Sequence, residues 1–66
     1  MTVIVNGTTT SMPEDATVSS VVATITKSPR GVAVALNGEV VPRSEWAGRR
    51  IDEGDRVEVL TAVGGG

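Results

Sequence analysis

Two Asn-Gly dipeptides, Asn6-Gly7 and Asn37-Gly38, constrain the fold of this chain more than any other feature. Each stands between short runs rich in β-branched or apolar residues. Asn and Gly both accept positive φ, which the tightest two-residue hairpin turn requires. The sequence therefore predicts two β-hairpins, with strands at residues 2–6 and 8–12, and at 32–36 and 39–41.

Between the two hairpins, residues 14–28 change to a helical period. The apolar residues of this segment recur at i, i+3, i+4 and i+7, as Val18, Val21, Val22 and Ile25. Asp15 or Thr17 can cap the first turn by accepting a backbone N–H bond, and Ser28–Gly31 is a clear stop. The many β-branched residues also suit a strand, but the spacing favours a helix of about three turns.

The second half of the chain predicts further strands. Residues 32–36 are nearly all apolar, which is typical of an inner strand covered on both faces. Arg43–Trp46 fits one helical turn with Trp46 as a lid on the core. Gly54 stands where the turn 52–55 needs positive φ, and residues 56–62 form a last strand.

The order of elements describes an α+β chain of the β-grasp type. We expect a mixed sheet of four or five strands with one helix packed on one face, and with the first and last strands central and parallel. The helix stripe is predicted to pack against Ile4, Leu36, Val57 and Val59. Residues 1–62 would form the single domain, and residues 63–66 a flexible glycine-rich tail.

Composition excludes several function classes. The 66 residues include no Cys and no His, so disulfides, thiol chemistry and typical zinc sites are excluded. The serines have no imidazole to activate them, so the domain is not expected to be an enzyme by itself. A net charge of −2 without clustered Lys and Arg argues against nucleic-acid binding. No apolar run suits a membrane span or signal peptide, which predicts a cytoplasmic protein.

The chain ends in Val63-Gly64-Gly65-Gly66. A glycine run has no packing purpose, because glycine in a regular element costs backbone entropy. One interpretation is a frayed end. The other is a tail without Cβ atoms that enters a narrow channel and presents its carboxylate in another protein's active site. Extended, these residues reach about 13 Å.

Three segments carry a family resemblance. They are Val34–Arg43 followed by Trp46, then Glu53–Val59, and Ala62–Gly66. Together with the opening Val3–Gly7 and the helix, they make the whole chain similar to the ubiquitin-like sulfur carriers, and most of all to those of thiamine biosynthesis. One departure is the third glycine, Gly64, where the family varies.

The resemblance implies that the Gly66 carboxylate carries sulfur, while Val63, Gly64 and Gly65 thread into partner sites. A ubiquitin-activating-like adenylyltransferase would activate Gly66 with Mg-ATP. Sulfur from a cysteine-derived persulfide would give a thiocarboxylate, which thiazole synthase would use. The carrier itself would bind no cofactor or metal and be a monomer when free. Two alternatives stay open: a carrier of the molybdopterin or cysteine route, and a non-covalent β-grasp binding module with an inert tail.

Strand alternation assigns a docking face. In the last strand Val57 and Val59 are predicted to face the helix, and Glu58, Leu60 and Ala62 the other side. Leu60 is then an exposed apolar residue close to the tail. It is either an ordinary surface leucine or part of a patch through which partners locate the tail, and we favour the patch.

Overall fold

In the computed structural model, which describes residues 1–61, the chain forms five strands, one α-helix and a short 3-10 helix. The strands are β1 (Thr2–Val5), β2 (Thr8–Ser11), β3 (Val32–Leu36), β4 (Glu39–Val40) and β5 (Arg56–Thr61). The helix α1 spans Val18–Ile25, and the 3-10 helix spans Arg43–Glu45.

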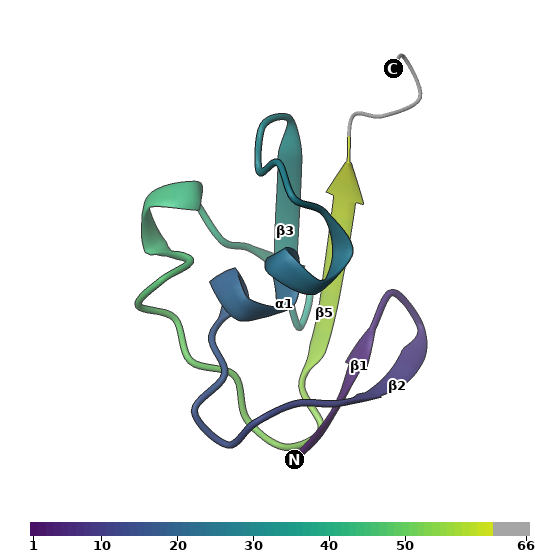
Figure 1. Cartoon of the computed structure of the whole chain (residues 1–66). Helices are drawn as coiled ribbons and strands as arrows, with labels where there is room; N and C mark the ends of the chain where they lie inside the picture. Colours follow the sequence, from purple (N-terminus) through teal and green to yellow (C-terminus); the bar gives the residue numbers. More distant parts are fainter. Residues whose placement is uncertain (62–66) are drawn as a thin grey trace.

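The strands form one sheet in the order β2-β1-β5-β3-β4, and α1 lies across one face of it (Figure 1). β1 runs parallel to β5, while the other neighbouring pairs are antiparallel. The predicted mixed β-grasp sheet is therefore confirmed, including its adjacent and parallel first and last strands. β5 lies in the middle of the sheet and runs away from the end of the molecule where the chain begins (Figure 1).

Both predicted hairpins are present and use the same turn chemistry. Asn6 and Gly7 have φ of 49° and 82°, and Asn37 and Gly38 have 51° and 86°. Positive φ at both central residues matches the right-handed twist of the flanking strands. The turns fix the register, pairing Val5 with Thr8 and Leu36 with Glu39.

The helix is shorter than the three turns predicted, because it has eight residues. Of the two predicted caps, Thr17 is the one used: its side chain accepts from the Ser20 N–H, and the Ser20 hydroxyl accepts from the Thr17 N–H. The helix ends where Thr26 becomes extended. The Thr26 hydroxyl donates to the carbonyl of Ser28 and accepts from its N–H, a local alternative to continuing the helix.

Two residues predicted to lie between helix and sheet are placed elsewhere. Ile25 is 39% exposed; it is the last helical residue, and Thr26 after it is extended. Ile4 is half-buried on the outer face, and its neighbours Val3 and Val5 face the core instead. Since successive strand residues point to opposite faces, Ile4 could not share the helix side with these two valines.

The prediction that β3 is covered on both faces is also wrong. Val34 and Leu36 are buried, but Ala33 is exposed and Ala35 is half-buried. The strand alternates Val or Leu toward the helix with Ala toward the outside, so its inner and outer positions are both apolar. A strand can therefore be apolar throughout and still be covered on one face only.

The core lies between the sheet and α1 and is completed by the segment after β4. Trp46 is 5% exposed, and its Nε1–H donates to the Val41 carbonyl at 2.8 Å. The predicted role of Trp46 as a core lid is confirmed. Fourteen apolar residues form this cluster: Val3, Val5, Met12, Ala16, Val18, Val21, Val22, Val34, Leu36, Val41, Trp46, Ile51, Val57 and Val59.

Candidate docking face and chain exit

The outer face of β5 carries the described residues that were predicted to meet a partner. Val57 and Val59 are 0% and 4% exposed and face the core, as predicted. Glu58 and Leu60 lie on the opposite face, where Leu60 is 69% exposed. The strand therefore presents one large apolar side chain to solvent one residue before its described end.

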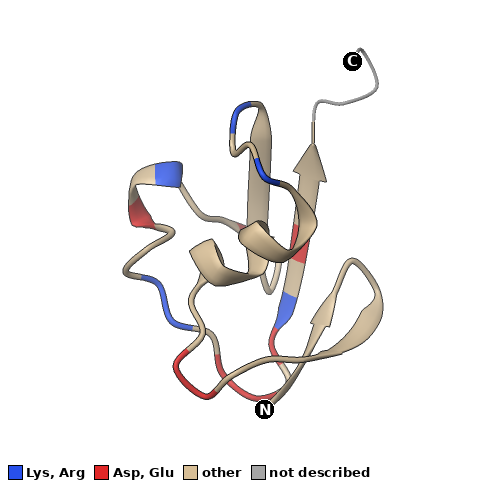
Figure 2. Ribbon diagram, in the orientation of Figure 1, with Lys and Arg blue, Asp and Glu red and all other residues tan. Residues whose placement is uncertain are grey.

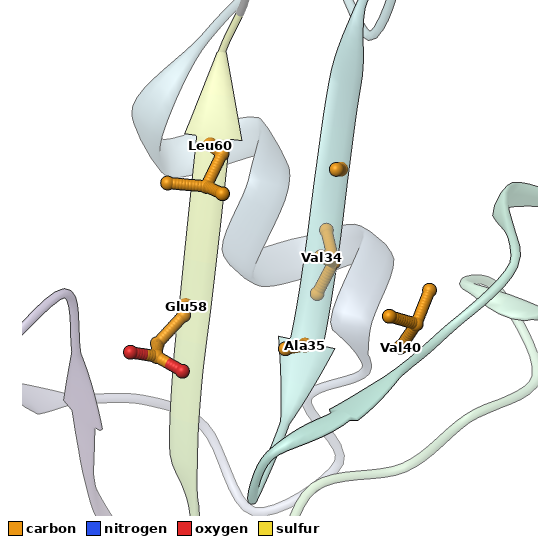
Figure 3. Close-up of a pocket in the computed structure, with 6 residues that line it drawn as sticks. Val34, Ala35, Val40, Glu58 and Leu60 are labelled. Atoms are coloured by element: carbon orange, nitrogen blue, oxygen red, sulfur yellow. The ribbon is translucent and has the colours of Figure 1, made fainter.

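A shallow hollow of about 170 Å³ lies beside Leu60 on this face. β3 contributes the small residues Ala33 and Ala35, which pair with Leu60 and Glu58 of β5. On the other side of β3, Ala35 pairs with Val40, which is 77% exposed. Leu60 and Val40 therefore stand on either side of a floor of small residues (Figure 3). We call Ala33, Ala35, Val40, Glu58 and Leu60 the outer patch.

The dimensions of the hollow suit contact with a partner protein better than binding of a free substrate. Its volume lies below the roughly 300–1,000 Å³ typical of small-molecule sites. Its rim consists of two exposed aliphatic side chains, Leu60 and Val40, and one carboxylate, Glu58. An exposed apolar group with a polar edge is typical of a protein-interaction surface.

The described part of β5 ends at Thr61, opposite Val32 at the start of β3. The loop before β3, residues 26–31, therefore lies next to this end, and it carries Lys27 and Arg30. Most acidic residues of the described chain lie toward the opposite end, near the N-terminus (Figure 2). A negatively charged reactant would meet less repulsion at the end where β5 finishes.

The structure brings only part of the predicted site together. Glu58 and Leu60 lie side by side on the outer face, whereas Ala62, Val63, Gly64, Gly65 and Gly66 lie outside the described residues. Sequence reasoning missed Ala33, Ala35 and Val40. The two-residue turn at Asn37-Gly38 is the sequence signal that predicts part of this set. Such a turn fixes the register and places Ala35 opposite Val40, so both lie on the outer face once the outward side of one strand is known.

The helices and the Asp and Glu side chains of residues 1–61 bear on membrane insertion and metal binding. Within them, no helix has the length and apolar character to cross a membrane. The same stretch places no group of three or more His, Cys, Asp or Glu side chains suitably for a metal ion.

Comparison with solved structures agrees with this architecture. A crystal structure of a thiamine biosynthesis protein (ThiS) from Geobacter metallireducens superposes with a TM-score of 0.81, at 32% identity and over all of both chains. The chain is thus a ubiquitin-like β-grasp protein whose central strand leads into a glycine-ended terminus. The model of the ThiS family matches residues 3–66, and the chain belongs to that family.

Two curated relatives support the assignment. A sulfur carrier protein ThiS of Escherichia coli is 30% identical over 50 residues, which are 76% of each chain. A thiazole synthase of Paramagnetospirillum magneticum is 32% identical over all 66 residues, although the chain spans only 20% of that relative's length. The chain is a sulfur carrier of thiamine biosynthesis and not an enzyme, which decides against the molybdopterin and cysteine routes.

Proposed function

We propose that the C-terminal carboxylate of Gly66 is the group that carries sulfur. The family match is the observation that supports this most, because it extends through residue 66. A terminal glycine has no side chain to shield its carbonyl carbon from attack. The described fold ends in the central strand β5, five residues before this carboxylate.

Activation of Gly66 requires a leaving group, since sulfur does not displace an oxygen directly from a carboxylate. In the proposed first step a carboxylate oxygen attacks the α-phosphate of ATP, pyrophosphate leaves, and an acyl-adenylate forms. A partner adenylyltransferase similar to ubiquitin-activating enzymes supplies the Mg-ATP site. The carrier supplies only the carboxylate and the surface by which it is held.

The second step introduces sulfur. The terminal sulfur of a persulfide, derived from cysteine, attacks the carbonyl carbon, and AMP leaves with the electron pair of the broken C–O bond. A thiol then cleaves the resulting acyl disulfide, which leaves a thiocarboxylate on Gly66 and a disulfide on the thiol side. The sulfur travels on the C-terminus, so the carrier needs no cysteine of its own.

The thiocarboxylate is a soft nucleophile that thiazole synthase would accept. The relative named thiazole synthase, of which one fifth aligns with this whole chain, supports this partner. Where the carrier is a separate chain, Val63, Gly64 and Gly65 would enter the active site of the synthase, since the two glycines have no side chain to obstruct a narrow channel. The free carrier would be a monomer.

Both partners would hold the carrier through the outer patch. Leu60 and Val40 are exposed apolar groups on the face that α1 leaves open, with Glu58 at their edge. Leu60 lies six residues before Gly66, so a partner seated on it is within reach of the carboxylate. Ala62 would extend the same row if the alternation of β5 continues.

Removing Gly65 and Gly66 tests the proposal. The carboxylate would then stop two residues, or about 7 Å, short of its place in the adenylate site. We expect pyrophosphate release with the adenylyltransferase and Mg-ATP to fall to background. The complete chain should instead gain the mass of a sulfur-for-oxygen replacement when a persulfide donor and a thiol are added.

Replacement of Gly65 by Val keeps the chain length and adds a side chain. It therefore tests passage through the channel separately from the position of the carboxylate. It should reduce adenylation less than the truncation does. Thermal melts of both variants should match the parent chain. Adenylation and sulfuration of the truncated chain would contradict the carrier role of Gly66.

A further inference from the structure

The side chain of Asn6 binds the backbone of a residue 53 positions later in the chain. Its Oδ1 accepts from the Val59 N–H at 2.7 Å, and its Nδ2 donates to the Val59 carbonyl at 3.2 Å. An amide side chain used in this way satisfies both backbone groups of one strand residue, as a neighbouring strand would do. It does so at the point where β1 has already turned away into β2.

These bonds continue the pairing of β1 with β5 by one step. The Ile4 N–H donates to the Asp55 carbonyl, and the Asn6 N–H donates to the Val57 carbonyl. Val59 is the next residue of β5 whose backbone N–H and carbonyl point toward the β1 side. The Asn6 side chain binds both of these groups in place of a neighbouring strand. β5 is therefore held from both sides as far as Val59, whereas within residues 1–61 the last two strand residues, Leu60 and Thr61, pair with β3 alone.

Without the Asn6 side chain, two-sided pairing would end at Val57. The part of β5 that pairs with β3 alone would then begin two residues earlier, at Glu58. Two extended residues span about 7 Å. Formation of the turn does not need these bonds, because glycine adopts the same positive φ. The side chain thus has a contact that its turn position does not explain.

We infer that Asn6 is a positioning residue that fixes the end of β5, and with it the place from which the chain continues toward Gly66 and the partner's active site. The inference rests on the proposed function of Gly66. Its effect should fall on partner binding, because a less fixed exit must be ordered whenever the carrier docks. The adenylation step itself, once the carboxylate is in place, should be unchanged.

Asn37 is a natural control for Asn6. It has the same turn position and nearly the same φ, and it also binds β5. Its Oδ1 accepts from the Arg56 N–H at 2.9 Å, and its Nδ2 donates to the Asp55 carboxylate at 3.0 Å. The first bond holds the first residue of β5, far from the exit, and the second holds the Asp55 side chain just before the strand. Asn6→Gly and Asn37→Gly therefore each remove two side-chain hydrogen bonds, toward the end of β5 in one variant and at its start in the other.

The test measures amide hydrogen exchange in both variants and their adenylation kinetics with the partner enzyme. Asn6→Gly should speed exchange of the Val59 amide by about tenfold or more and leave Arg56 unchanged. It should raise the KM for the carrier about fivefold, with kcat within about twofold. Asn37→Gly should speed exchange at Arg56 and leave the KM within about twofold.

Equal KM values for the two variants, or an unchanged Val59 amide in Asn6→Gly, would overturn the inference. If the parent chain itself is not adenylated, the proposed function fails, while the exchange data still decide whether Asn6 holds β5. Should Asn6→Gly not fold, Asn6→Asp keeps the acceptor for the Val59 N–H and removes the donor. It should then raise the KM in the same direction by a smaller factor, and an unchanged KM would equally overturn the inference.

Discussion

Both faces of the sheet carry aliphatic side chains, but these side chains differ in exposure from one face to the other. On the inner face, Val34, Val57 and Val59 lie under α1 and are at most 4% exposed. On the outer face, Leu60 and Val40 are 69% and 77% exposed, although they are equally apolar. Val59 and Leu60 are adjacent in one strand, yet Val59 is buried and stabilises the fold, whereas the Leu60 side chain is exposed and could contact a partner protein.

Exposure, and not hydrophobicity, distinguishes these aliphatic positions of the two faces. A buried aliphatic side chain contributes about 1.5–3 kcal/mol relative to an exposed one. Leu60 contributes little of this in the free chain, so its apolar surface is available to a partner. Substitutions on the two faces should consequently have opposite effects, on folding for the inner face and on binding for the outer one.

The largest effect is expected from Val22→Asp on the inner side. Val22 is 4% exposed and lies on the helix stripe that faces the sheet. A carboxylate there would lose its hydration without gaining a partner, a cost of several kcal/mol that exceeds what a small domain can sustain. Circular dichroism at neutral pH should show an unfolded chain.

Ala23→Asp is the matched control, since Ala23 is the next helical residue and is exposed. It introduces the same charge and should remain folded, with a loss below about 1 kcal/mol. A folded Val22→Asp chain with the melting temperature of the parent would remove the distinction between a packed and an open face.

Most of the fold could be predicted from local signals. The Asn-Gly turns set both hairpins, and the spacing of Val18, Val21 and Val22 set the helix against the sheet. The end of the helix could not be placed, because Thr26 forms side-chain bonds with Ser28 that no periodicity reveals. The face that Ile4 takes could not be predicted, because Thr2–Val5 are four successive β-branched residues and hide the alternation.

The candidate site was less predictable than the fold. Leu60 and Glu58 followed from alternation along one strand, which is a local property. Ala33, Ala35 and Val40 join them only through strand pairing, which brings residues from distant positions together. The Asn6 contact was missed for the same reason, since the turn signal explains its conformation and says nothing about a bond to Val59.

A smaller effect is expected on the outer face, from Leu60→Arg. Exposed positions contribute little to stability, so unfolding free energy should change by less than about 0.5 kcal/mol. Affinity for the adenylyltransferase should fall about tenfold or more, because a charge would replace the largest apolar group of the outer patch. Isothermal titration calorimetry alongside thermal melts measures both quantities.

Thr9→Arg controls for the added charge. Thr9 pairs with Ile4 on the outer face but belongs to the edge strand β2, away from the outer patch. It should leave the affinity nearly unchanged. Equal losses in the two variants would indicate a general electrostatic effect and would return Leu60 to the ordinary surface residues.

The smallest effect is expected from Glu58→Gln, which distinguishes an apolar from an electrostatic outer patch. Glu58 is exposed at the edge of the hollow, so solvent screens its charge. Its removal should change the association rate with the adenylyltransferase by less than about threefold, and added salt should abolish the difference. Glu39→Gln, the same change on the exposed edge strand β4, should have no effect. If stopped-flow measurements showed that Glu58→Gln lowers the association rate as much as Leu60→Arg does, the partner would recognise charge. The outer patch would then bind through its charge as well as through its exposed apolar side chains.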